Sequence, residues 1–308
     1  MHFFEEMLLG ASMSLSENFT IFFSMSDVQH ISMKGKICLV TGANTGIGFE
    51  TAKALARMGA RVGLVCRTPA KCEDAKSTIL QAVPDAELGS FAADLSSQAE
   101  IRRVAADITR TYPKIDVLIN NAGIVENTFK RSVDGIEMTF AVNHLAYFLL
   151  TNLLLEPIKA AAPSRIINVS SAAHFGARID FDDLQGEKGY NGWRAYSQSK
   201  LANILFTYEL ARRLADTGVT VNCLHPGVIG TKLFRNLGII NTLAGIFLAS
   251  PEKGAETSVY LASSPEVEGV TGKYFDNKRA VPSSSASYNE ADAKRLWQIS
   301  AELTHLSD

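Results

Sequence analysis

Six short runs of apolar residues, each followed by a longer segment with helical periodicity, recur along most of the chain. Short all-apolar strands that alternate with helices are typical of a parallel sheet that is buried on both faces. Right-handed crossovers arrange such units as a doubly wound α/β sheet of the Rossmann type, with helices on both faces. The expected strands are 37–40, 62–66, 88–93, 117–119, 165–169 and 219–224, and a last helix is expected at about 291–303.

Length and composition fit one folded domain of this class. The chain has 308 residues, and its 46% hydrophobic and 20% charged residues exclude a disordered protein. Thirty basic and 32 acidic side chains nearly balance, so the chain has no general electrostatic attraction for nucleic acid or anionic lipid. The cysteines lack the spacing of metal ligands, which predicts no metal site, no disulfide and reduced thiols. They are Cys38, Cys66, Cys72 and Cys223.

The first 34 residues differ from the rest of the chain. Polar residues interrupt their apolar runs, which stay short of the ~18 apolar residues of a membrane span. Glu5 and Glu6 stand where a secretory signal carries basic residues. We therefore expect a poorly ordered extension at 1–34, a dinucleotide-binding domain at 35–308 and a cytoplasmic protein with nothing before Lys36 in its core. Two alternatives are a peripheral membrane anchor within the extension and a chain that starts at Met33.

A glycine-rich turn joins the first expected strand to the first helix. Residues 41–48 read TGANTGIG, with the spacing G-x3-G-x-G. Glycines at such a turn allow backbone N–H groups to approach a pyrophosphate at the helix N-terminus. A plain strand-to-helix turn also uses glycine, so the position at the start of the fold carries the prediction of a dinucleotide site. Its expected contacts are Gly42, Asn44, Thr45, Gly46, Ile47 and Gly48.

The end of the second strand normally decides between the two nicotinamide cofactors. An acidic residue there would bind the ribose 2′-hydroxyl, but this chain has Arg67. The arginine fork suits a 2′-phosphate, which predicts a preference for NADP(H) over NAD(H). The alternative is an arginine that faces solvent. Asp94 and Leu95, after the third strand, are expected near the adenine ring, although Asp94 could instead cap a helix that starts near Ser96.

A tyrosine and a lysine four residues apart, Tyr196 and Lys200, share one face of a helix. A neighbouring ammonium lowers the pKa of a phenol and suits it to acid–base catalysis. This pair is common by chance, and its weight comes from polar residues expected at the same sheet edge. Ser170 and Ser171 end the fifth strand, residues 120–123 end the fourth, and Asn143 lies in the next helix. Capping and solvation are the alternative roles of Ser170 and Asn143.

With these motifs the chain resembles the short-chain dehydrogenase/reductase family over about residues 35–276. The resemblance rests on 41–48, 120–123, Asn143, Ser171, Tyr196 with Lys200, and the sequence HPG at 225–227. Within the family the chain is most similar to the retinol dehydrogenase branch. The segments that carry this similarity are 41–48, 168–171, 183–185, 199–203 and 272–275, together with the long 171–196 interval.

The resemblance implies roles for individual residues. Tyr196 is the general acid in carbonyl reduction and the base in alcohol oxidation. Lys200 holds the nicotinamide ribose and lowers the pKa of the tyrosine. Ser171, rather than Ser170, binds the substrate oxygen, and Asn143 supports a water in a proton relay. Further cofactor contacts are expected from Asn121, Ala122, Gly123, Pro226, Gly227, Val228 and Thr231.

Substrate choice is expected to depend on residues 174–194 and 228–250. The second segment is rich in Leu, Ile and Phe, which suggests a lid over a bulky apolar substrate. Its alternative is a helix that packs on the domain or on another subunit. The family resemblance also implies a homodimer or a homotetramer.

The leading functional hypothesis is an NADP(H)-dependent alcohol dehydrogenase or carbonyl reductase for a lipophilic substrate, such as a retinoid or another apolar aldehyde or ketone. The alternative from another class is a non-catalytic, NADP-binding redox sensor. An intact tyrosine, lysine and serine argue against a sensor, which has no use for a proton relay. A nucleotide-sugar epimerase also uses such a pair, but it carries a different glycine spacing and a larger C-terminal domain.

Overall fold

A computed structural model of the chain describes residues 31–227 and 249–306. Two units are distinguished, Met1–Ile31 and Ser32–Asp308, and the described residues belong almost entirely to the second. The predictions for residues 1–30, for Val228 and Thr231 and for most of the 228–250 segment concern residues outside the described ranges. Among the described residues, no helix is long and apolar enough to cross a membrane.

One eight-stranded sheet runs through the second unit, in the order β3-β2-β1-β4-β5-β6-β7-β8. The neighbouring strands pair in parallel except β8, which pairs antiparallel with β7. The doubly wound fold and its six predicted strands are confirmed, whereas the two short edge strands were not expected. The strands are β1 Ile37–Thr41, β2 Arg61–Cys66, β3 Leu88–Ala92, β4 Val117–Asn120, β5 Ser164–Val169, β6 Val219–His225, β7 Tyr274–Asp276 and β8 Arg279–Val281.

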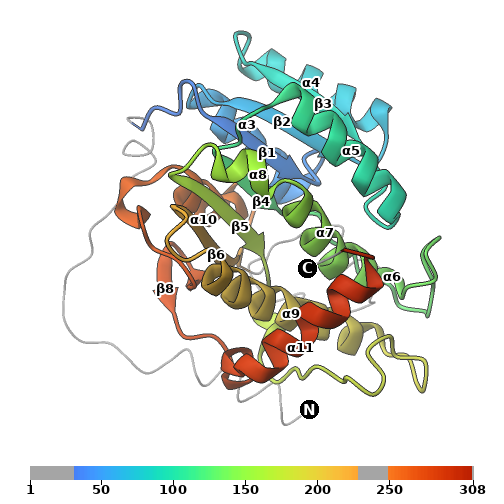
Figure 1. Cartoon of the computed structure of the whole chain (residues 1–308). Coiled ribbons are helices and arrows are strands. Elements are labelled where there is room, and N and C mark those ends of the chain that lie inside the picture. The colour runs from blue at the N-terminus through green and yellow to red at the C-terminus, as the bar shows by residue number, and fades with distance from the viewer. Residues whose placement is uncertain (1–30, 228–248, 307–308) are drawn as a thin grey trace. The chain divides into compact units, whose positions relative to one another are not determined.

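Helices cover both faces of this sheet (Figure 1). Side chains of α5, α7, α9 and α11 pack in one core, and those of α3, α4 and α10 pack in another. The described helices are α3 Gly46–Arg57, α4 Pro69–Ala82, α5 Gln98–Thr111, α6 Met138–Phe140, α7 Ala146–Leu153, α8 Leu155–Lys159, α9 Gly192–Arg213, α10 Pro251–Ser263 and α11 Glu290–Leu303. Short turns of other helical types lie at Ala141–Leu145, Ala172–His174, Pro265–Val267 and Ser285–Tyr288.

Alternation along β1 explains why its sequence is apolar throughout. Leu39 belongs to the core on one face, while Cys38 and Val40 belong to the core on the other, and all three are fully buried. A strand covered on both faces has no side chain in water, so its sequence shows a continuous apolar run rather than an alternating one.

The core begins earlier in the chain than expected. Met33 is buried in the core that contains α3, and its backbone N–H donates to the carbonyl of Met58 at 2.8 Å. The expectation that nothing before Lys36 packs is therefore wrong at Met33. A single methionine carries no periodic signal, so only the packing of the chain end against α3 places it inside.

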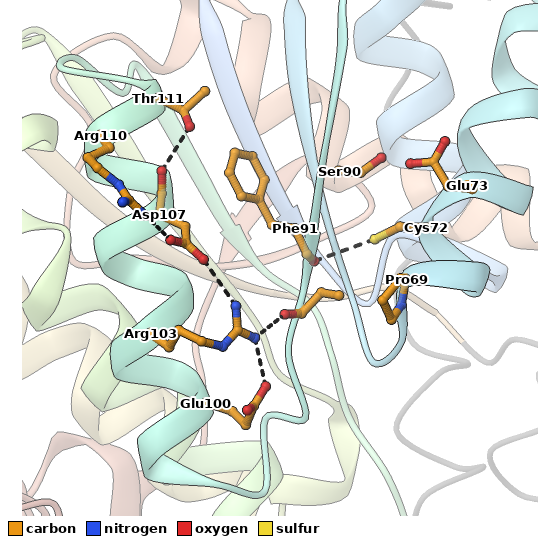
Figure 2. Close-up of a pocket in the computed structure, with 11 residues that line it drawn as sticks. Pro69, Cys72, Glu73, Ser90, Phe91, Glu100, Arg103, Asp107, Arg110 and Thr111 are labelled. Atoms are coloured by element: carbon orange, nitrogen blue, oxygen red, sulfur yellow. Dashed lines mark hydrogen bonds and ion pairs between the residues drawn. The ribbon is translucent and has the colours of Figure 1, made fainter.

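A groove of about 830 Å³ follows the free edge of the sheet, between α4 and α5 (Figure 2). Arg103 crosses it, donating to the carbonyl of Ala92 at 2.6 Å and pairing with Glu100 and Asp107. These bonds satisfy an exposed backbone carbonyl of the edge strand and neutralise the charges in the groove. None of the predicted catalytic residues lines it.

Candidate active site

The strand order reverses between β1 and β4, and the loops that leave these two strands lie side by side. Asn121 donates its side-chain amide to the carbonyl of Thr41 at 2.8 Å, and the Thr41 hydroxyl accepts from the backbone N–H of Asn121 at 2.8 Å. In open α/β sheets, ligands bind at the carboxyl edge of such a switch point. The structure therefore brings the predicted glycine turn and the predicted 121–123 segment to one place.

Two glycines are required by this close approach. A Cβ atom on Gly48 would lie 2.4 Å from both the Asn121 amide nitrogen and the carbonyl oxygen of Gly42. Gly42 has a φ of +67°, and a Cβ there would lie 3.0 Å from the Cα of Ala122. Any side chain at these positions would push the two loops apart.

The N-terminus of α3 opens onto this junction. Its cap residue, Thr45, makes no side-chain capping bond, and its first turn holds no acidic residue. Unpaired N–H groups at a helix start attract an anion. The chemistry of the turn that contains Asn44, Gly46 and Ile47 therefore fits the pyrophosphate of a dinucleotide.

Arg67 directly follows β2 and is exposed. Within residues 31–227 and 249–306, no hydrogen bond or ion pair engages its guanidinium. An unpaired cation beside the dinucleotide edge fits a phosphate, although the alternative of a solvent-facing arginine predicts the same exposure.

The segment after β3 differs in detail from expectation. Helix α5 begins at Gln98 with Ser97 as its cap, so Asp94 does not cap it. A carboxylate oxygen of Asp94 instead accepts from the backbone N–H and the hydroxyl of Ser96, at 2.9 and 2.8 Å. Leu95 is buried in the core beneath this turn. The local turn thus uses one Asp94 oxygen, and the adenine contact remains a prediction.

Helix α9 carries Tyr196 and Lys200 on one buried face. The Lys200 ammonium nitrogen lies 5.6 Å from the centroid of the Tyr196 ring and donates to the carbonyl of Val169 at 3.1 Å. That carbonyl ends β5, so the bond directs the lysine to the carboxyl edge of the sheet. The structure therefore brings the predicted pair to the predicted edge.

Burial has a strong effect on both groups. It raises the pKa of Tyr196 to about 12, while a hydrogen bond with Ser171 acts in the opposite direction. It lowers the pKa of Lys200 to about 8. The hydrogen bond with Ser171 therefore opposes part of the effect of burial on the pKa of Tyr196, and the role expected of the ammonium stays a prediction.

The two adjacent serines have different surroundings. Ser170 is buried and donates its hydroxyl to the carbonyl of Lys200 at 2.8 Å, which ties β5 to α9. Ser171 is partly exposed, contacts Tyr196 and accepts from the backbone N–H of Ala173 at 3.1 Å. The choice of Ser171 over Ser170 agrees with this geometry.

Asn143 lies in a π-helical turn, Ala141–Leu145, rather than in a regular helix. Its side chain bonds the N–H and the carbonyl of Ile124 at 2.8 and 3.0 Å, and donates to the Ser199 hydroxyl at 3.0 Å. A Cβ added to Gly123 would lie 3.5 Å from both the Asn143 amide oxygen and the Lys200 ammonium. Asn143, Gly123 and Lys200 therefore enclose one small space, and π-helical turns occur frequently at functional sites.

The last predicted cofactor segment follows β6. Pro226 and Gly227 leave the strand at the same edge, and Gly227 has a φ of +88°. The imidazole of the preceding residue, His225, accepts from the backbone N–H of Ala172 at 3.2 Å. No individual role was predicted for this imidazole or for that of His174, although His225 opens the quoted motif at 225–227 and His174 opens the segment 174–194 expected to affect substrate choice.

Comparison with known proteins agrees with this geometry. The family model described as short chain dehydrogenase matches residues 36–239. Human retinol dehydrogenase 14 is 45% identical over 294 residues, which cover 89% of this chain and 88% of the relative. A crystal structure of an uncharacterized protein from Mycobacterium paratuberculosis superposes with a TM-score of 0.75 at 33% identity, covering 90% of this chain and 97% of that one. A short chain dehydrogenase from Escherichia coli CFT073, complexed with NADPH, gives a TM-score of 0.66 at 26% identity, covering 82% and 99%.

The chain belongs to the short-chain dehydrogenase family and is an oxidoreductase of that family. Within the family it falls with the retinol dehydrogenase branch.

Proposed function

We propose that this chain interconverts an alcohol and a carbonyl compound with NADP(H), and that Tyr196 is its acid–base catalyst. The observation that carries the proposal is the buried pair of Tyr196 and Lys200, together with the partly exposed Ser171, at the carboxyl edge of the sheet. When bound, the nicotinamide cofactor supplies or removes the hydride.

The residues of the chain move the proton. Tyr196 gives its phenolic proton to the substrate oxygen in reduction and takes it from the hydroxyl in oxidation. Ser171 donates a hydrogen bond to the same oxygen, while its contact with Tyr196 keeps the two groups together. Lys200 orients the ribose through its ammonium, and Asn143 supports a water that connects Lys200 with solvent. The shared space of Asn143, Gly123 and Lys200 supports this last role.

Preference for NADP(H) rests on Arg67. Its exposed guanidinium follows β2, where an acidic residue would serve NAD(H). A structural relative complexed with NADPH has the same fold. A 2′-phosphate would give Arg67 a charge-assisted pair.

A lipophilic substrate is supported by aromatic side chains beside the catalytic group. Trp193, one turn before Tyr196 on α9, is 45% exposed, and its ring centroid is 6.0 Å from that of Tyr196. Phe175, four residues after Ser171, is 51% exposed. Exposed aromatic surface next to a reacting group favours a bulky apolar aldehyde or ketone, such as a retinoid.

The proposal is tested by NADPH consumption with a panel of apolar and polar aldehydes and ketones, and by NADH consumption in parallel. We expect turnover of the apolar carbonyls with NADPH. Tight NADPH binding without turnover of any carbonyl, or of any alcohol with NADP, would instead favour the redox sensor.

A further inference from the structure

The peptide group between Ser171 and Ala172 is held at both ends by histidine side chains. Its carbonyl oxygen, on Ser171, lies 2.6 Å from Nδ1 of His174. Its N–H, on Ala172, donates to Nδ1 of His225 at 3.2 Å. The same carbonyl also accepts from the backbone N–H of His174 at 3.2 Å. Two imidazoles on one peptide group are nevertheless a specific arrangement, because such groups are normally bonded by backbone or water alone.

The hydrogen bonds of His174 require one neutral tautomer. Its Nε2 accepts from the backbone N–H of Ser284 at 3.1 Å, so the ring proton resides on Nδ1 and is donated to Ser171. The ring is fully buried and packs against Tyr274, with centroids 4.9 Å apart. Burial lowers the pKa of His174 to about 4, which keeps this donor–acceptor pattern at neutral pH.

His225 approaches the same peptide from the end of β6. Burial lowers its pKa as well, although the charge of Asp276, its register partner on β7, opposes this effect. Because Nδ1 accepts from Ala172, the proton of the neutral ring resides on Nε2. The two rings lie close together because both contact the same peptide group.

We propose that His174 and His225 form a clamp that positions the Ser171 hydroxyl against Tyr196. The proposal rests on the catalytic roles of Ser171 and Tyr196 given above. Ser171 lies two residues beyond the end of β5 and outside its strand pairing, so the orientation of its backbone depends on contacts made by the next peptide group. A rotation of that peptide would carry the hydroxyl away from the phenol, and neither histidine would touch substrate.

The clamp has a consequence that mere stabilisation of the fold lacks. The hydrogen bond with Ser171 lowers the pKa of Tyr196. A misplaced Ser171 would therefore raise the pH at which alcohol oxidation reaches half its maximal rate. It would lower kcat. Substitution of His174 would leave the KM for NADP nearly unchanged, because the ring of His174 bonds Ser171 and Ser284, and neither is an expected cofactor contact.

Two substitutions of His174 separate its two bonds. Asparagine places an amide nitrogen near the position of Nδ1 and retains the donor to Ser171, while it loses the bond from Ser284. Glutamine places an amide oxygen near the position of Nε2 and retains the acceptor for Ser284, while it loses the bond to Ser171. His174→Asn and His174→Gln are thus a matched pair of nearly equal polarity.

We measure kcat, the KM for NADP and the pH profile of alcohol oxidation for both variants and the wild type. His174→Gln is expected to lose between about tenfold and a hundredfold in kcat, the scale of a small misplacement. Its profile should move up by about one pH unit, the size of one lost bond to a charged group. His174→Asn should stay within about threefold of wild type.

The same pair at His225 tests the second half of the clamp in a less buried position. His225→Asn retains an acceptor near Nδ1, whereas His225→Gln moves it one bond further, and the same order of kcat and pH shift is expected. Thermal unfolding of all four variants identifies any that fail to fold. The clamp is then judged on the position, His174 or His225, at which both the asparagine and the glutamine variant fold.

Equal behaviour of the asparagine and glutamine variants, or a loss of kcat without a shift of the pH profile, would overturn the clamp. A higher kcat for His174→Gln than for His174→Asn would also overturn it, because His174 would then act through its bond with Ser284. If the wild type turns over no alcohol or carbonyl, the proposed function fails first, and that result is visible before any variant is compared.

Discussion

Tyr196 shows how far a single residue depends on its surroundings. Its buried phenol has a pKa of about 12, too high for a base at neutral pH without further interactions. The Ser171 bond opposes burial, and Lys200 is close enough to act on a phenolate. The proposed acid–base side chain is therefore readily chosen from the sequence, but its strength as an acid depends on three side chains, two on α9 and one after β5.

Tyr196→Phe removes the hydroxyl and retains the packed ring. We expect kcat to fall by about 10²–10⁴-fold, the usual loss when an acid–base group is removed. The affinity for NADPH, measured by fluorescence titration, should change little because the ring survives. A variant that retains more than about a tenth of wild-type kcat would exclude Tyr196 as the catalyst.

Arg67→Asp tests the cofactor preference at another single residue. A 2′-phosphate contact is worth roughly 1.5–3 kcal/mol, or about 10–150-fold in affinity. The aspartate should repel that phosphate and offer a carboxylate to the ribose hydroxyls of NADH. Titration of both cofactors against wild type and variant measures the change. Equal wild-type affinities, or a variant that still prefers NADPH, would mean that Arg67 only faces solvent.

At the scale of elements, the π-helical turn Ala141–Leu145 joins the site to the C-terminal helix. Asn143 turns toward the catalytic group, while the next residue, His144, is fully buried and lies 2.9 Å from the Ser300 hydroxyl of α11. The extra residue in this turn directs two adjacent polar side chains to different partners. A regular helix would be the default prediction from its apolar sequence.

The buried histidines make the fold sensitive to acid. Burial lowers the pKa of His144 and of His174 to about 4, whereas an imidazole in the unfolded chain titrates near 6.5. The unfolded chain therefore binds these protons first, and the native state loses stability as the pH falls from about 6.5 to about 4. Each residue contributes at most about 1.4 kcal/mol per pH unit, and the two together remove about 3 kcal/mol between pH 6.5 and pH 5.

Urea denaturation at several pH values measures this loss. The control is His144→Gln, whose amide reaches the Ser300 hydroxyl but does not titrate. We expect the dependence of the free energy of unfolding on pH to be about half as steep in this variant. An unchanged slope would show that His144 does not take up a proton on unfolding.

At the scale of the whole molecule, one sheet carries two cores and one functional edge. Loops from β1, β4, β5 and β6 reach that edge, and each supplies a part of the site. The compact unit starts at Ser32, and Met33 already packs in its core.

A chain of residues 33–308 is therefore expected to fold and to retain activity in buffer without detergent. Met33 keeps its place against α3, and the free energy of unfolding should change by less than about 1 kcal/mol, as for loss of a chain end outside the core. Circular dichroism, thermal unfolding and NADPH consumption compare it with the full chain. An insoluble or inactive product would show that residues 1–32 pack on the fold or anchor it.

The sequence alone determined the architecture, and it predicted candidate site residues, several of which the structure brings to one edge of the sheet. Continuous apolar runs predicted the six inner strands, and the glycine turn with the Tyr196–Lys200 pair pointed to the dinucleotide site and its catalyst. Such signals are local, because a strand buried on both faces and a turn beside a phosphate each restrict the residue types at their own positions. Strands β7 and β8 are three residues each and lack a local signal of this kind.

Only the tertiary structure decided the pKa values of the site residues and the hydrogen bonds that hold these residues in place. It showed that burial raises the pKa of Tyr196, that Ser170 ties β5 to α9, and that Ser97 rather than Asp94 caps α5. It also brought His174 and His225 onto one peptide group. Desolvation, and hydrogen bonds such as those of Ser170 with Lys200 and of Ala172 with His225, 30 and 53 positions apart, depend on which elements pack together. No local pattern in the chain records that packing.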